Sequence, residues 1–215
     1  MDELNEIAQL ALEVLEARHQ TREKALGLSR RLIRHSANTI RAVHRGEFAK
    51  AQEMLEEGRV LVEQFNTDVA GEPRIYEAGY VHAALKEFAE ASITYALITG
   101  QPLPGPDELN MDYPAYLNGL GEAMGEMRRA VLDLIRRGDL DTGEQLLKTM
   151  DEVYGVLVTV DYPEALTKGL RRTTDMVRGV TERTRGDLTV AVRQQSLENT
   201  LKEFEDKFLD RVSQD

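Results

Sequence analysis

The stretch YEAGYVHAALKEFAEASITYALIT, residues 76–99, has the pattern of a helix that is apolar on nearly every side. At about 100° per residue, one face carries Val81, Ala84, Leu85, Phe88, Ser92 and Tyr95. The opposite face carries Tyr76, Gly79, Ala83, Thr94, Leu97 and Ile98, and with them Glu87 and Glu90. A helix that is hydrophobic all round is normally buried. Its two carboxylates must then be paired, protonated or bound to a metal.

The rest of the chain also has helical periodicity and lacks runs of alternating β-branched residues, so the sequence predicts an all-α fold. Three similar tetrapeptides, RGEF at 45–48, RGDL at 137–140 and RGDL at 185–188, are typical of corners between helices. We therefore expect one domain over residues 1–215, a bundle of about seven helices. The expected helices are 2–45, 47–66, 76–99, 115–137, 141–158, 163–185 and 187–211.

Composition narrows the classes of function. The absence of cysteine excludes disulfides and thiolate metal sites, and four histidines make an imidazole zinc site a poor prediction. No apolar run is long enough to cross a membrane and the acidic N-terminus is unlike a signal peptide, which predicts a cytoplasmic protein without a membrane partner. A net charge of -11 argues against a broadly basic nucleic-acid surface, although local clusters can override that sum.

A second pair of glutamates, Glu122 and Glu126, lies four residues apart on the expected helix 115–137. Small residues flank it, including Gly119 and Ala123, and would let another helix come close. Two facing helices would then place four carboxylates around one cavity, and Mg²⁺ or Mn²⁺ would compensate their charge. Such a metal can support phosphodiester hydrolysis. Glutamate pairs with these spacings are also common on solvated helix faces, and spacing alone leaves both interpretations open.

Basic residues form a stripe on the first helix. Arg30, Arg34, Arg41 and Arg45 fall within about 60° of one another by the helical period. Arginine contacts to phosphate supply much of non-specific nucleic-acid affinity, so the stripe is a candidate RNA-binding surface. A solvated face that pairs with acidic neighbours explains the same pattern.

Three runs together resemble the translin family, and more closely its translin-associated factor X (Trax) branch. They are ALKEFAEAS at 84–92, DYPAYLNGLGEAMGEMRR at 112–129 and RRGD at 136–139, followed by a late basic helix. The resemblance implies a seven-helix bundle that assembles into hollow oligomers, often octamers, and binds RNA and single-stranded DNA. The Trax branch further implies a Mg²⁺-dependent endoribonuclease.

Carried onto this sequence, the resemblance matches Glu87, Glu90 and Glu126 to acidic positions of the Trax branch, while Glu122 stands where that branch usually has aspartate. The leading hypothesis is an endoribonuclease in a homo-oligomer, or in a hetero-oligomer with a translin paralogue. Glu87, Glu90, Glu122 and Glu126 would hold Mg²⁺ or Mn²⁺, and the arginine stripe would hold the RNA. The alternatives are an RNA or single-stranded DNA-binding oligomer without catalysis, and a purely structural helical oligomer.

Overall fold

Eight helices account for most of residues 2–212, the part of the protein that the structure, a computed structural model, describes. They are α1 (Asp2–His44), α2 (Phe48–Val69), α3 (Pro73–Tyr76), α4 (Gly79–Thr99), α5 (Tyr113–Arg137), α6 (Leu140–Val158), α7 (Glu164–Thr167) and α8 (Leu170–Val212). No strand occurs within this range, which confirms the all-α prediction. Five of the seven expected helices are present as α1, α2, α4, α5 and α6. The last two expected helices, 163–185 and 187–211, are mostly one helix, α8, and the single turns α3 and α7 are additional short helices.

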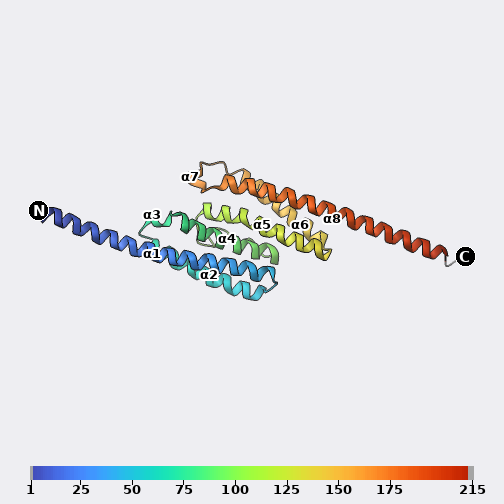
Figure 1. The fold of residues 1–215 in the computed structure, drawn as a ribbon, viewed down its shortest axis with the longest axis horizontal. Coiled ribbons are helices and arrows are strands. Elements are labelled where there is room, and N and C mark those ends of the chain that lie inside the picture. Colours follow the sequence, from blue (N-terminus) through green and yellow to red (C-terminus); the bar gives the residue numbers. More distant parts are fainter. Residues whose placement is uncertain (1, 213–215) are drawn as a thin grey trace.

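The helix predicted from the opening stretch lies at the centre of the bundle. α4 packs between α1 and α5, α2 covers α1, and α6 and α8 pack on the far side of α5 (Figure 1). Along α4, the side chains of Leu85, Phe88 and Ile93 are almost completely buried. The helix begins later than predicted: Tyr76 ends α3, and Ala78 is an extended residue that precedes α4.

Two of the three predicted corners are confirmed. Gly46 and Gly138 have φ of 73° and 77°, the left-handed conformation that glycine adopts at low cost after a helix. Asp139 then accepts a hydrogen bond from the backbone N–H of Thr142 at the start of α6. The sequence therefore identified these turns for the correct physical reason.

The third corner, at Gly186, was predicted wrongly, because α8 continues through it without a break. The charged neighbours of this glycine bind other helices instead of ending their own. Arg185 contacts Asp151 of α6 at 2.6 Å, and Asp187 contacts Arg128 of α5 at 2.8 Å. A glycine inside a helix costs only about 1 kcal/mol relative to alanine, so such packing readily carries the helix through.

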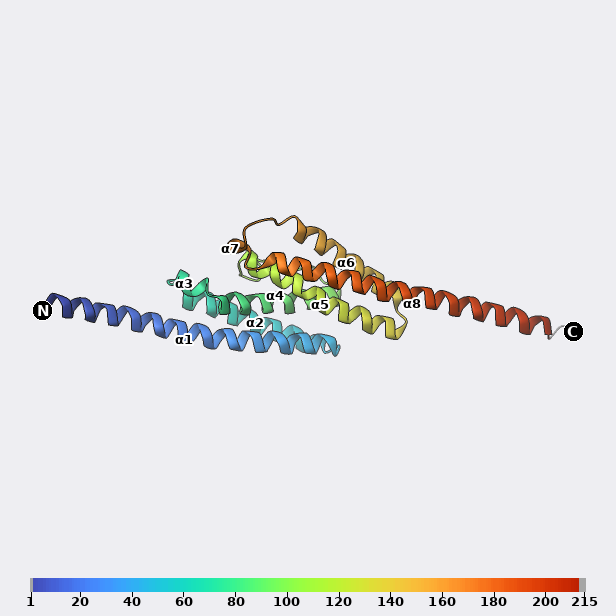
Figure 2. The ribbon, with the colours of Figure 1, turned by 45° about the horizontal axis from the view of Figure 1, so that its top comes forward.

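Both long helices extend beyond the bundle, α1 at its N-terminal end and α8 at its C-terminal end, in opposite directions (Figures 1 and 2). The α8 extension exposes an apolar stripe with spacings of four, three and four residues: Leu197, Leu201, Phe204 and Phe208. The α1 extension exposes Leu4, Ile7 and Val14 among others. Within residues 2–212, no helix is both long enough and apolar enough to cross a membrane.

Candidate metal centre

A close contact between α4 and α5 builds the site. A Cβ atom placed on Gly119 would lie 2.6 Å from the Cβ of Ala89 and 2.6 Å from the carbonyl oxygen of Lys86. These distances leave no room for any side chain at position 119. The glycine therefore lets α5 approach the backbone of α4, and Glu122, three residues further on, reaches the face of α4 that carries Glu87 and Glu90.

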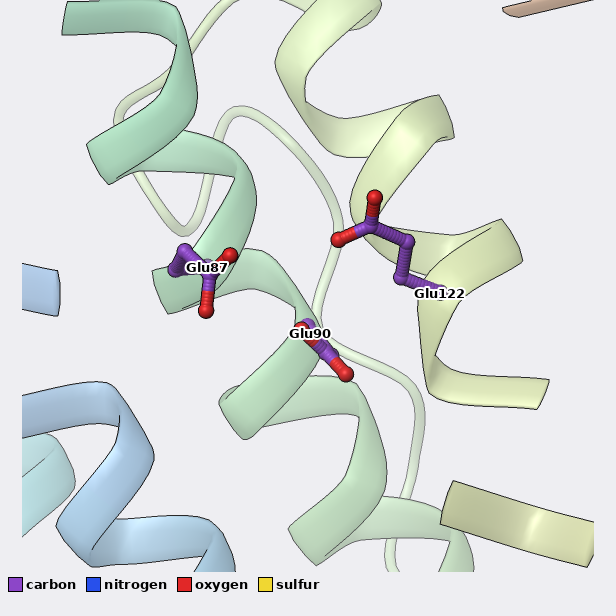
Figure 3. A group of neighbouring side chains, drawn as sticks. All are labelled: Glu87, Glu90 and Glu122. Atoms are coloured by element: carbon purple, nitrogen blue, oxygen red, sulfur yellow. The ribbon is translucent and has the colours of Figure 1, made fainter. Parts of the chain in front are cut away.

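Three of the four predicted carboxylates come together there. Oxygen atoms of Glu87, Glu90 and Glu122 all lie within 4.8 Å of one another, and each side chain is partly buried. Figure 3 shows the two α4 glutamates and the α5 glutamate converging on the space between the helices. We refer to these three residues as the acidic cluster. The fourth predicted residue, Glu126, does not belong to it.

Lys86 lies against the acidic cluster. Its Nζ atom donates a 2.6 Å hydrogen bond to Glu122 and is 3.6 Å from Glu87, while only 20% of its side chain is exposed. This ammonium group offsets part of the charge that the carboxylates would otherwise concentrate. The protein thus carries a built-in cation at the edge of the site.

The pKa values of the cluster reflect burial and mutual repulsion. Burial, followed by the charges of Glu87, Glu122 and Glu126, raises the pKa of Glu90 from 4.5 to about 8. Burial also raises the pKa of Glu87, against the lowering effect of Lys86. Glu90 is consequently protonated at neutral pH while the cluster holds no metal, because a third negative charge there is unfavourable.

Glu126 has a different partner. Its carboxylate is hydrogen-bonded to Nε2 of His44, near the end of α1, and the histidine side chain is only 5% exposed. This hydrogen bond outweighs burial and lowers the pKa of Glu126 below its ordinary value. Glu126 therefore remains ionised and fixed to α1, one turn along α5 from Glu122.

The acidic cluster fits a hard divalent cation in its donor chemistry. Mg²⁺ prefers oxygen ligands at about 2.0–2.1 Å, so two ligands on opposite sides of the ion are about 4.2 Å apart. The cluster oxygens lie within 4.8 Å of one another, close to this separation. Glu87, Glu90 and Glu122 are thus the residues that could hold Mg²⁺ or Mn²⁺.

The predicted arginine stripe is exposed along its whole length, at Arg30, Arg34, Arg41 and Arg45. By the helical period, Arg30 and Arg41 point within about 40–60° of the direction of His44. Since His44 contacts Glu126, this edge of α1 borders the carboxylate-bearing face. Arg34 and Arg45 point about 80–100° away from His44, so only the edge of the stripe formed by Arg30 and Arg41 is turned toward Glu126.

Sequence reasoning did not assign a role to Lys86 or His44. The position of Lys86, directly before Glu87, was a usable signal, since a cation beside a carboxylate pair is a natural counter-ion. His44 gave no such signal, because its partner Glu126 lies 82 residues away in the chain.

Comparisons with known proteins agree with this architecture. No protein-family model matches the chain. An uncharacterized protein of Methanocaldococcus jannaschii, MJ0175, is 30% identical over 204 residues, which covers 94% of this chain and 88% of the relative.

Solved structures of related chains are similar over nearly their whole length. AfC3PO is 31% identical with a TM-score of 0.78, and the match covers 88% of this chain and 97% of that one. The complex of AfC3PO with duplex RNA gives 30% identity and a TM-score of 0.75, over 89% of this chain and 97% of that one. The fold also matches apo-NeC3PO, at 20% identity and a TM-score of 0.76, over 86% and 96% of the two chains. With its translin-like bundle and relatives at this level of identity, the chain belongs to the translin/C3PO family.

Proposed function

We propose that the protein is a Mg²⁺- or Mn²⁺-dependent endoribonuclease of the Trax-like branch. The observation that carries the proposal is the convergence of Glu87, Glu90 and Glu122 within 4.8 Å from two helices held in contact by Gly119. A divalent cation there supplies Lewis-acid activation of water and offsets negative charge on a phosphate. The three carboxylates hold the cation, and Glu90 releases its proton when it does so.

The other residues of the proposed site bind the RNA or position a carboxylate. The exposed arginines 30, 34, 41 and 45 hold the phosphates of an RNA strand beside the carboxylate-bearing face. His44 fixes the orientation of Glu126, the fourth carboxylate. The negative charge of Glu126 contributes to the raised pKa of Glu90. The RNA-bound relative AfC3PO supports an RNA ligand for this family member as well.

The proposal includes an assembly of identical chains in the cytoplasm. The apolar stripe of the α8 extension has the three- and four-residue spacing of helices that pair lengthwise. The residues of α8 that pack in the bundle, such as Val177 and Leu188, lie on a different side of that helix. A chain cannot cover this stripe with its own bundle, so we assign it to a second copy. Sedimentation of a monomer at micromolar concentration would contradict this assignment.

One experiment tests the nuclease. Labelled single-stranded RNA is incubated with the purified protein, in Mg²⁺ or in chelator, and followed both on a cleavage gel and in a binding assay. We expect Mg²⁺-dependent cleavage that Glu87→Ala abolishes while RNA binding persists. Undiminished cleavage by Glu87→Ala would refute the assignment of the acidic cluster.

A second candidate function is RNA or single-stranded DNA binding without catalysis. The observation that favours it is Lys86, whose ammonium already neutralises part of the cluster through its 2.6 Å bond to Glu122. With Glu90 protonated as well, the carboxylates need no metal to be stable. This function predicts salt-sensitive binding of the same RNA with no cleavage in either Mg²⁺ or Mn²⁺.

A further inference from the structure

Two helical extensions leave the bundle with exposed apolar faces. Every residue of α1 from 3 to 20 is exposed, and no residue of α8 from 189 to 209 is buried. At 1.5 Å per residue, these segments are about 27 Å and 32 Å long. They project from opposite ends of the bundle, so the two extensions of one chain cannot cover each other (Figure 1). Contiguous apolar surface of this kind marks an interaction site.

Both faces follow the alternating three- and four-residue spacing of a coiled-coil seam. The α8 seam extends the apolar stripe of that helix and consists of Val190, Gln194, Leu197, Leu201, Phe204 and Phe208. The α1 seam consists of Ile7, Leu10, Val14 and Ala17. The large apolar side chains of the two seams are 51–69% exposed. Seams with this spacing are buried when a second helix packs lengthwise against them.

The charges beside the seams favour one orientation of the two helices. In coiled coils, the flanking positions called g and e, just before and just after the seam, decide partner and orientation. On α8 the g side is basic and the e side is acidic, whereas on α1 the g side is acidic and the e side carries an arginine. The α8 residues are Arg193 and Lys207 at g and Glu198 and Glu205 at e, and the α1 residues are Glu6 and Glu13 at g and Arg18 at e. Antiparallel helices place g against g and e against e, so unlike charges meet.

One antiparallel register also matches the apolar layers. It places Phe204 opposite Ile7, Leu201 opposite Leu10, and Leu197 opposite Val14. Lys207 then lies beside Glu6, and no like charges face each other at the flanking positions. A parallel pair would instead place the acidic g side of α1 against the acidic e side of α8, which is unfavourable.

Pairing of two α8 extensions with each other explains less of the surface. In an antiparallel α8 pair, Glu198 of one copy faces a glutamate of the other, which is repulsive. A parallel α8 pair avoids this conflict, because Arg193 meets Glu198 of the partner subunit. It leaves the α1 seam of both copies exposed, however, and only a pair between α1 and α8 covers both seams.

The shape of the chain allows both pairs to form in one closed dimer. α1 and α8 run in the same direction along the bundle (Figures 1 and 2). A two-fold axis perpendicular to that direction exchanges the ends of the bundle and reverses the helices. It brings the α1 extension of one copy beside the α8 extension of the other, antiparallel, and repeats the contact at the opposite end. Such an isologous contact closes on itself and exposes no further copy of the same surface.

We propose that the chain forms an antiparallel two-fold dimer in which each α8 extension packs against the α1 extension of the partner. This inference rests on the assembly of identical chains in the proposed function and names the surfaces that form it. It is independent of the nuclease chemistry.

Disulfide cross-linking of the full chain tests the contact without background, because the sequence has no cysteine. Oxidation of the double variant Leu10→Cys/Leu201→Cys should give a covalent dimer on a non-reducing gel, since a disulfide requires Cα atoms within about 7 Å. Leu10→Cys alone and Leu201→Cys alone should remain monomeric on the gel. Leu10→Cys/Val60→Cys is the matched control, because Val60 is equally exposed but lies on α2, and it should not cross-link.

A charge exchange gives a second measurement that leaves the seams intact. Lys207→Glu should raise the dissociation constant of the dimer in sedimentation about tenfold, because each dimer contains the Lys207–Glu6 pair twice. Adding Glu6→Lys to the same chain should restore the wild-type value. Absence of this rescue would contradict the antiparallel register.

Three cross-linking results would overturn the proposal. They are no covalent dimer of the double variant, a covalent dimer of Leu201→Cys alone, which indicates α8–α8 pairing, and a covalent dimer of Leu10→Cys alone, which indicates α1–α1 pairing. Sedimentation separates this failure from that of the proposed function. An oligomer without the α1–α8 cross-link removes only this contact, a wild-type monomer removes the assembly as well, and neither result bears on RNA cleavage.

Discussion

The acidic cluster and the His44–Glu126 pair both contain partly buried carboxylates, yet the pKa values of Glu90 and Glu126 shift in opposite directions. Burial, reinforced by the neighbouring carboxylates of Glu87, Glu122 and Glu126, raises the pKa of Glu90 to about 8. Glu126 has a histidine neighbour, and its pKa falls. Burial raises the pKa in both regions and is the largest cause at Glu90, which is the more deeply buried of the two, whereas at Glu126 the hydrogen bond to His44 outweighs it. Lys86 offsets only part of the charge of the acidic cluster, so the cluster favours a metal ion more than Glu126 does, which is already paired with His44.

The acidic cluster and the His44–Glu126 pair should differ most in their contribution to metal binding. Glu87→Gln and Glu122→Gln each remove a charged ligand from the acidic cluster, and we expect Mn²⁺ affinity to fall at least about 100-fold, because even outer-shell partners cost about 10–100-fold. Isothermal titration with Mn²⁺ measures the change. Glu144→Gln, an exposed substitution on α6, is the control and should bind Mn²⁺ like the wild type.

Removing the hydrogen bond between His44 and Glu126 should lower Mn²⁺ affinity less than removing a ligand of the acidic cluster does. His44→Ala leaves the partly buried Glu126 without its hydrogen bond, which should destabilise the fold by about 1 kcal/mol and weaken Mn²⁺ binding by about tenfold. Chemical denaturation and Mn²⁺ titration of the same variant give both numbers. If His44→Ala weakens Mn²⁺ as strongly as Glu87→Gln does, Glu126 and His44 belong to the metal centre itself and the division between the two regions is wrong.

The pH dependence of stability separates the regions further. Between pH 4.5 and about 8, the folded protein keeps a proton on Glu90 that the unfolded chain has lost. The free energy of unfolding contributed by Glu90 therefore falls as the pH rises through this window. In metal-free thermal melts from pH 5 to 8, the melting temperature of Glu90→Gln should fall less than that of the wild type. The difference at pH 8 should be a few degrees. Identical pH profiles for the variant and the wild type would contradict the shifted pKa of Glu90.

The smallest expected effect concerns the exposed arginine stripe of α1, the helix that carries His44. Replacing any one arginine of the stripe by glutamine should reduce the slope of log affinity against log salt by about 0.7 for single-stranded RNA. The four variants are Arg30→Gln, Arg34→Gln, Arg41→Gln and Arg45→Gln. Filter binding at several salt concentrations gives the slope. Arg74→Gln, an exposed arginine on α3, should leave it unchanged, and an equal loss there would mean that the stripe has no special role.

The sequence was sufficient to predict features that depend on local chemistry. The helical period of residues 76–99 identified the central helix, and the small residues around Gly119 correctly indicated a close helix contact. Features that depend on distant partners were not predictable in this way. Arg185 and Gly186 have the local pattern of a corner, but the ion pair with Asp151 on α6 accompanies an unbroken helix. Glu126 has the spacing of a cluster ligand, but its partner His44 lies 82 residues away in the chain.

Anomalous diffraction from crystals grown with Mn²⁺ tests the central claim most directly, because it locates the ion without relying on activity. The predicted result is one or two peaks bounded by the carboxylates of Glu87, Glu90 and Glu122, with the ammonium of Lys86 displaced from its 2.6 Å bond to Glu122. An anomalous map with no peak between α4 and α5, and with Lys86 still bonded to Glu122, would contradict the metal centre and favour RNA binding without catalysis.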